Sequence, residues 1–95
     1  MERVLKIEKS KRRSKKYVAT VTGNRRIWFG SSDHGQYFDR ALGLYSRKNH
    51  KDAKRRRNYF MRHSGVPGKR AAIQKELRKS RGKLNARILA HRFLW

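Results

Sequence analysis

The stretch KKYVATVTGNRRIWFG, residues 15–30, is the part of this sequence that decides the fold. Residues 17–22 alternate between two sets of apolar, aromatic and β-branched side chains, which is typical of a strand. Gly23-Asn24 follows, and these two residue types tolerate the positive φ angles of a tight hairpin turn. Residues 27–30 are expected to form the return strand, so the stretch predicts a β-hairpin.

A further short strand is expected before the hairpin, in RVLKIEK at residues 3–9, because Val4, Leu5 and Ile7 are apolar. The basic run at residues 9–16 would connect this strand to the hairpin as a solvated loop or arm. Two or three strands are not stable alone in water. Helices are therefore expected to cover one face of them.

The stretch HKDAKRRRNYFMRH, residues 50–63, predicts a basic helix. Asn49 is a suitable N-cap, and it would place the acidic Asp52 in the first turn, where the helix N-terminus favours negative charge. The pair Ser64-Gly65, with Pro67 shortly after it, predicts the end of the helix.

The remaining segments complete one domain over residues 1–95. Residues 31–49 are expected to be a polar connection in which Asp39 caps a short helical turn. The C-terminal part, residues 69–95, contains a predicted helix at 69–80 and a helical or extended segment at 84–95. The predicted fold class is α+β, with a small β-hairpin or three-stranded antiparallel sheet packed on two or three short helices, and a basic N-terminal arm or loop.

Charge dominates the composition. Lys and Arg number 28 against 6 Asp and Glu, which gives a net charge of +22 on 95 residues. This charge repels itself and opposes compaction, so we expect an anionic partner to stabilise the fold. The sequence has no cysteine, no apolar run long enough to span a membrane and no signal-peptide pattern at its start. We therefore expect no membrane-spanning segment and no secretion by that route.

Catalysis and cofactor binding are not expected. The six carboxylates form no acid–base pair by spacing, the four histidines lack metal-ligand spacing, and residues 64–70 lack the context of a phosphate-binding loop. The sequence predicts no enzyme, no metal, no cofactor and no small-molecule substrate.

Three basic runs predict contact with a polyanion or an acidic protein, because clustered cations bind phosphates without sequence preference. The acidic inner surface of a capsid, a packaged genome and RNA all fit. The same runs could give access to the nucleus. The predicted contact residues are Lys9, Lys11, Arg12, Arg13, Lys15, Lys16, Lys51, Lys54, Arg55, Arg57, Arg62, Lys69 and Arg70.

Two further groups of residues are predicted to be structural. On the helix at 50–63, one stripe is interpreted as a clamp that holds the helix to the hairpin. It contains Asp52, Arg56, Tyr59 and His63. The apolar end of the chain is interpreted as an anchor that tucks into the hairpin or into a neighbouring subunit. It consists of Phe93, Leu94 and Trp95. We expect the ten aromatic residues to build the core rather than to stack on bases.

The sequence resembles a family of small, very basic, largely uncharacterised proteins of large nucleocytoplasmic DNA viruses. The resemblance covers most of the chain after Ser14. It rests on Lys15, Tyr17, Phe29, Gly30, Tyr37, Asp39, His50, Asp52, Arg55, Arg56, Tyr59, Arg62, His63, Leu94 and Trp95. It adds His50 to the predicted clamp.

This resemblance implies a virion protein made in the infected host cell and located in the capsid. The expected function is that of a minor capsid or cement component, whose cationic surface bridges the major capsid protein and other acidic capsid subunits. The alternative is a protein that binds viral DNA without sequence preference and condenses the genome. A basic ribosomal-type protein is a third interpretation.

Overall fold

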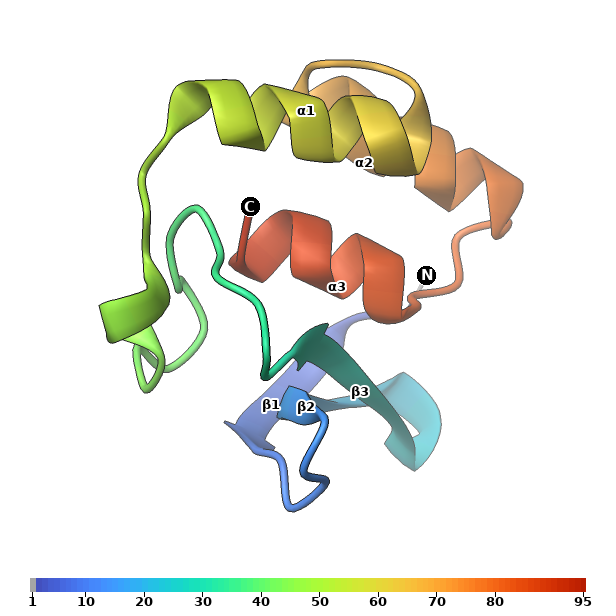
Figure 1. Cartoon of the computed structure of the whole chain (residues 1–95). Coiled ribbons are helices and arrows are strands. Elements are labelled where there is room, and N and C mark those ends of the chain that lie inside the picture. The colour runs from blue at the N-terminus through green and yellow to red at the C-terminus, as the bar shows by residue number, and fades with distance from the viewer. Residues whose placement is uncertain (1) are drawn as a thin grey trace.

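The computed structural model describes residues 2–95 and has an α+β fold. Three strands are followed by three α-helices, with two single 3-10 turns between them (Figure 1). The elements are β1 (Val4–Lys9), β2 (Lys15–Val21), a 3-10 turn (Thr22–Asn24), β3 (Arg25–Ser31), a second 3-10 turn (Ser46–Lys48), α1 (Ala53–Ser64), α2 (Lys69–Lys79) and α3 (Ala86–Phe93). The predicted fold class is confirmed.

The sheet is antiparallel, with strand order β1-β2-β3. Gly23 and Asn24 have φ angles of 83° and 63°, which confirms the predicted hairpin turn. The connection between β1 and β2 is tighter than predicted. Lys15 and Lys16 belong to β2, and the amide of Ser10 donates to the carbonyl of Lys16. The predicted solvated loop over 9–16 was too long at both ends, because Lys9 belongs to β1 and Lys15 and Lys16 to β2, whereas residues 11–14 form an exposed turn. Lysine can occupy a strand because its long stem carries the ammonium away from the backbone.

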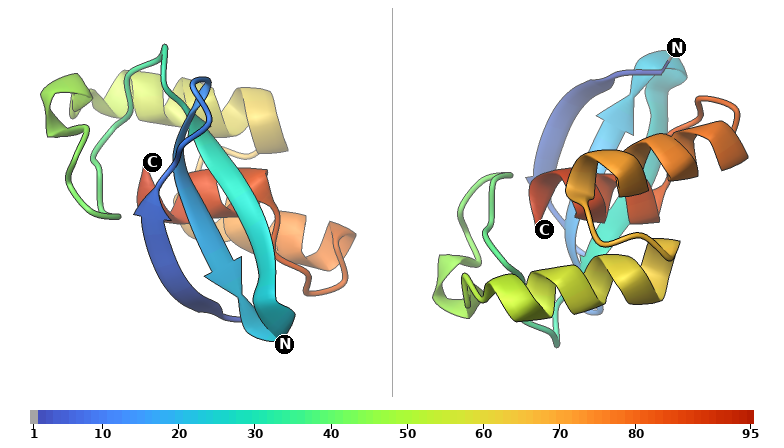
Figure 2. Two further views of the ribbon diagram at one scale, coloured as in Figure 1. Left: turned by 90° about the horizontal axis from the view of Figure 1, so that it is seen from below. Right: turned by 90° about the horizontal axis from the view of Figure 1, so that it is seen from above.

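Helix α3 lies between the sheet and the other two helices (Figures 1 and 2). Its apolar side packs on the inner face of the hairpin, and no helix of residues 2–95 covers the outer face of the sheet (Figure 2). The buried core consists of Tyr17, Ala19, Val21, Ile27 and Phe29 from the sheet, with Leu84, Ile88, Leu89 and Leu94 from the C-terminal segment. A second small cluster, of Tyr59, Phe60 and Ala72, holds α1 to α2.

Helix α1 begins later than predicted. Asp52 is its N-cap, and the Asp52 carboxylate accepts hydrogen bonds from the amides of Lys54 and Arg55. Asn49 is therefore not the cap. Its side-chain oxygen is used by the preceding connection, where it accepts from the amide of Asp39 at 2.8 Å. The helix ends as predicted, with Gly65 at φ 71°.

The connection between β3 and α1 contains no helical turn capped by Asp39. The Asp39 side chain is buried and accepts hydrogen bonds from the Tyr17 hydroxyl and from the amides of Ala41 and Tyr45. Burial, together with the hydrogen bond to Asp39, raises the pKa of Tyr17. A single carboxylate thus ties an irregular segment to the core, which is why this segment needs no regular structure of its own.

The C-terminal anchor packs within the chain itself. Leu94 is 1% exposed, Phe93 contacts Phe29, and Trp95 stacks on Tyr59. The carbonyls of Phe93 and Leu94 accept hydrogen bonds from the amides of Arg40 and Phe38. Of the two alternatives predicted for this end, the hairpin of the same chain and a neighbouring subunit, the structure shows the first.

Gly30 of the hairpin lies directly against Leu94 of the anchor. Its φ is +79°, and a Cβ there would lie 2.7 Å from Cδ1 of Leu94. We expect Gly30→Ala to lower the free energy of unfolding by about 2 kcal/mol, from backbone strain together with the clash. Gly23→Ala is the control, since Gly23 has a similar φ of +83° but nothing within 4 Å, and about 1 kcal/mol is expected. Urea denaturation measures both; equal losses would contradict the close approach.

No helix within residues 2–95 is long and apolar enough to cross a membrane.

Candidate polyanion site

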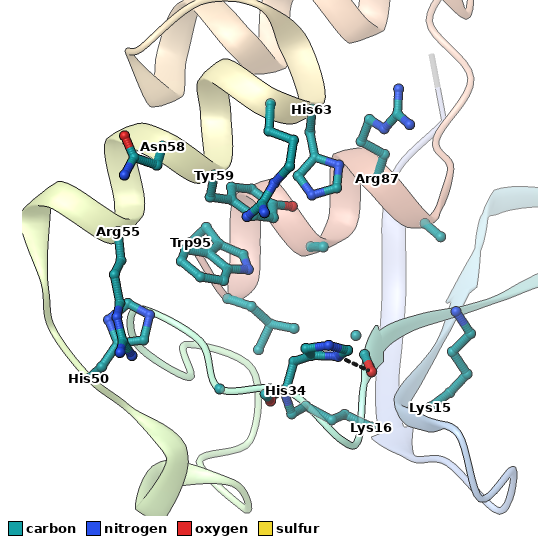
Figure 3. A pocket seen from close by; sticks show the side chains of 17 residues that line it. Lys15, Lys16, His34, His50, Arg55, Asn58, Tyr59, His63, Arg87 and Trp95 are labelled. Carbon is teal, nitrogen blue, oxygen red and sulfur yellow. Dashed lines mark hydrogen bonds between the residues drawn. The ribbon is translucent and has the colours of Figure 1, made fainter.

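A cavity of about 800 Å³ opens where the sheet, α1 and α3 meet (Figure 3). The start of β2 and the end of β3 form one wall, α1 forms the opposite wall, and the C-terminal residues form the floor. Five cationic residues line it, namely Lys15, Lys16, Arg55, Arg62 and Arg87. Three histidines line it as well, namely His34, His50 and His63. None of its lining residues is Asp or Glu.

Most of these cations are free to bind an anion. Among residues 2–95, Lys15 and Arg62 have no carboxylate within ion-pair distance. Arg55 pairs with Asp52 at 3.8 Å, and both side chains are exposed, so this ion pair is weak. Arg87 pairs at 3.6 Å with Glu76, whose carboxylate is buried. An incoming anion can therefore compete for Lys15, Arg55 and Arg62, whereas Arg87 serves the buried carboxylate.

Lys16 differs from the other cations of the cavity. Its side chain is buried, and its ammonium donates a hydrogen bond to the carbonyl of His34 at 2.7 Å. Burial, together with the nearby charge of Lys48, lowers the pKa of Lys16 to about 8. The prediction that Lys16 contacts a polyanion was wrong, because its ammonium is occupied in holding the connection to β2.

The floor of the cavity is aromatic. Trp95 stacks on Tyr59 with a centroid distance of 4.1 Å and an angle of 5° between the ring planes. The imidazole of His50 lies 5.2 Å from Trp95, and that of His63 lies 4.5 Å from Tyr59. Burial, followed by the charge of neighbouring arginines, lowers the pKa of both histidines. Both rings are therefore mostly neutral at physiological pH.

His50 carries an unpaired donor. Its Nδ1 accepts a hydrogen bond from the amide of Asp52 at 3.0 Å, so the proton of the neutral ring is on Nε2. Nε2 is buried and has no hydrogen-bond partner within residues 2–95. A buried N–H without an acceptor is energetically unfavourable, and a ligand oxygen would relieve it.

The predicted clamp residues hold α1 to α3 and to the connection, and not to the hairpin. The Tyr59 hydroxyl contacts His91 of α3, and the Arg56 guanidinium lies 4.5 Å from the Tyr37 ring centroid. His63 packs on Tyr59, whereas Asp52 is exposed at the start of the helix. The clamp interpretation was wrong about the partner because α3 lies between α1 and the sheet.

The structure distributes the other predicted contact residues over several faces. Lys9, Lys11, Arg12 and Arg13 lie at the β1–β2 turn, where the Arg12 guanidinium stacks 3.5 Å from the Trp28 ring centroid. Lys51, Lys54 and Arg57 are exposed at or near the start of α1, and Lys69 and Arg70 begin α2. The ammonium of Lys69 donates to the carbonyl of Arg92, and burial lowers its pKa to about 8.

Arg87, Asn58 and His34 belong to the cavity wall but were not predicted as contact residues. No local pattern could have identified Arg87 or His34, because each reaches the cavity only through the packing of α3 and of the connection. Asn58 lies within the predicted helix, between Arg55 and Arg62, and helical spacing would have found it.

A buried Ser–His–Glu group beside the cavity is structural. The Ser64 hydroxyl donates to Glu76 at 2.9 Å and contacts Nε2 of His91 at 2.8 Å, while the Tyr59 hydroxyl contacts Nδ1 at 2.9 Å. In a catalytic triad the histidine lies between the serine and the acid. Here the serine lies between the histidine and the acid. These three side chains and that of Tyr59 are all buried.

Within residues 2–95, no group of three or more potential metal ligands comes together. Comparison with known proteins gives no relative: no family model, curated protein or solved structure matches this chain. The viral resemblance therefore stays a prediction.

Proposed function

We propose that this chain is a non-enzymatic protein that binds nucleic acid through phosphate contacts, without sequence preference, and that the cationic cavity is the centre of its binding surface. The observation that carries the proposal is the composition of the cavity, which is lined by Lys15, Arg55 and Arg62 and has no carboxylate among its lining residues. This arrangement favours a ligand with several closely spaced negative charges.

The rest of the surface supports the same proposal. Residues 2–95 contain four ion pairs, so most of the 28 basic side chains have no internal counter-charge. Nucleic acid provides anionic groups at regular short intervals along its whole length. A folded acidic protein surface offers fewer carboxylates over the same distance. The geometry therefore favours genome or RNA binding over the cement function that the resemblance implies.

A minor capsid function is the second candidate, and a separate observation favours it. Phe38, Leu42 and Leu44, all on the connection, are 39%, 49% and 55% exposed. Apolar side chains exposed in one segment are typical of a protein contact. Immunolabelling of the shell of purified virus particles tests this candidate, and absence from the shell would exclude it.

Fluorescence anisotropy with a labelled oligonucleotide tests the proposed function. We expect the logarithm of the binding constant to fall linearly with the logarithm of salt concentration between about 50 and 200 mM. The double variant Lys15→Ala with Arg62→Ala should reduce the slope on a single strand by about 1.4, because each lost phosphate contact removes about 0.7.

The matched control for this double variant is Arg78→Ala with Lys79→Ala. These two exposed residues lie at the end of α2 and outside the cavity. The control removes the same charge and should change the slope less. The cavity is not the centre of binding if both double variants change the slope equally. Absence of binding at low salt contradicts the proposed function altogether.

A further inference from the structure

We infer that the cavity binds one unpaired nucleotide of a single strand, with the base against Trp95 and the adjacent phosphates on Lys15, Arg55 and Arg62. This inference rests on the proposed function and specifies the form of nucleic acid that the chain prefers.

The size and shape of the cavity fit such a ligand. Its volume of about 800 Å³ lies within the range of sites that enclose small molecules, of roughly 300–1,000 Å³. The bases of a duplex are stacked inside the helix, so a duplex has to unpair and expose a base before it can fill a cavity. A single strand offers a free base without this cost. A half-open cavity that a base can enter therefore favours single strands, whereas a flat cationic surface would not distinguish a single strand from a duplex.

Trp95 is held rigidly in position for a stacking contact. Tyr59 packs on the indole, and the hydroxyl of Tyr59 is fixed in turn by its hydrogen bond to His91. The neighbouring Leu94 is buried in the core. The indole itself is partly exposed, lines the cavity, and lies between His50 and His34 in Figure 3. Stacking on such a preformed ring accepts any base, because every base has an aromatic face.

Hydrogen-bond donors and cations line the cavity around the indole of Trp95. Arg55 and Arg62 are seven residues apart on α1, which places them on the same face of the helix about two turns apart. Lys15 lines the cavity from the sheet, and His50, whose Nε2 has no hydrogen-bond partner within residues 2–95, lines it as well. Phosphates on both sides of a bound base would have a cation on each wall.

Intrinsic fluorescence tests the inference without disturbing the stack. The chain has two tryptophans, and Trp28 lies on β3, outside the cavity. In the variant Trp28→Phe, Trp95 is the sole tryptophan, and a short single strand should quench its emission by half or more. The same strand lacking its bases should bind without quenching, and its affinity should be lower by about tenfold. The variant Trp95→Phe is the matched control, in which quenching of Trp28 should be small.

The outcomes separate the two proposals. Equal quenching by the intact and the base-free strand, or tighter binding of a duplex than of a single strand, overturns the inference but leaves nucleic-acid binding in place. Absence of binding to every nucleic acid overturns the proposed function as well. Inorganic polyphosphate should displace the single strand without quenching Trp95. Quenching by polyphosphate would show that the cavity takes phosphate alone and would contradict the role of the base.

Discussion

Replacing Asp39 with alanine is expected to lower the free energy of unfolding by about 4 kcal/mol, because the substitution leaves buried donors without an acceptor. The Asp39 carboxylate accepts from the Tyr17 hydroxyl and from the amides of Ala41 and Tyr45. Tyr17 is fully buried, so its hydroxyl has no access to water once the carboxylate is removed. The loss should also loosen the connection and with it the cavity wall formed by His34.

Urea denaturation followed by circular dichroism measures this effect. Asp33→Ala is the matched control, because Asp33 is an exposed carboxylate of the same connection with no hydrogen bond from its side chain within residues 2–95. The loss in free energy of unfolding for Asp39→Asn should fall between those of Asp39→Ala and Asp33→Ala. The amide keeps one acceptor oxygen, but it turns an N–H toward one of the buried donors. A loss below about 1 kcal/mol for Asp39→Ala would show that the connection is not held by this carboxylate.

Acidification is expected to remove about 3 kcal/mol of stability as the pH falls from about 6.5 to about 4, through His91 alone. Burial lowers the pKa of His91 from 6.5 to about 4, although the nearby Glu76 acts in the opposite direction. The unfolded chain binds a proton to this imidazole below pH 6.5, whereas the folded chain does so only below about pH 4. The stabilisation is therefore complete above pH 6.5 and decreases through this interval.

The hydrogen bonds around His91 explain why the neutral ring is required. Ser64 donates its proton to Glu76, so its oxygen must accept from the Nε2–H of His91. Nδ1 is then unprotonated and accepts from the Tyr59 hydroxyl. Each donor in this series of hydrogen bonds, from Tyr59 through His91 and Ser64 to Glu76, has one acceptor. A second proton on His91 would sit on Nδ1 and point at the hydroxyl proton of Tyr59. One of these two donors would then have no acceptor.

Urea denaturation at a series of pH values, combined with NMR titration of the histidine rings, tests this expectation. His50 and His63 contribute with the same sign, because their pKa values are lowered too. The variant His34→Ala is the control, since His34 is exposed, and it should retain the pH dependence of the parent. Stability that stays constant over this interval, or a His91 ring that titrates near pH 6.5, would falsify the neutral network.

The buried network and the cationic cavity are parts of one structure. Tyr59 contacts His91 through its hydroxyl and Trp95 through the face of its ring. Loss of the neutral His91 network in acid should therefore displace the aromatic floor of the cavity as well as destabilise the fold. Nucleic acid bound there would oppose both changes, because a ligand that binds only the folded state stabilises it.

The local sequence pattern was sufficient to predict strand β2, the hairpin turn and the end of helix α1. Alternation in residues 17–22 predicted β2, the pair Gly23-Asn24 predicted the turn, and Gly65 predicted the end of α1. These features depend on neighbours within a few residues, and backbone sterics decide them. The charge of +22 follows from composition alone, and so does the expectation of an anionic partner.

Tertiary packing decided which side chains act together. Lys15 and Lys16 are adjacent and chemically identical, yet Lys15 lines the cavity without a counter-charge and Lys16 is buried on a carbonyl. Helix α3 lies between α1 and the sheet, and this position turned a predicted clamp on the hairpin into contacts with His91 and Trp95. Such pairings join residues more than thirty positions apart. They depend on which surfaces exclude water together in the folded chain, and the order of residues along a segment does not contain that information.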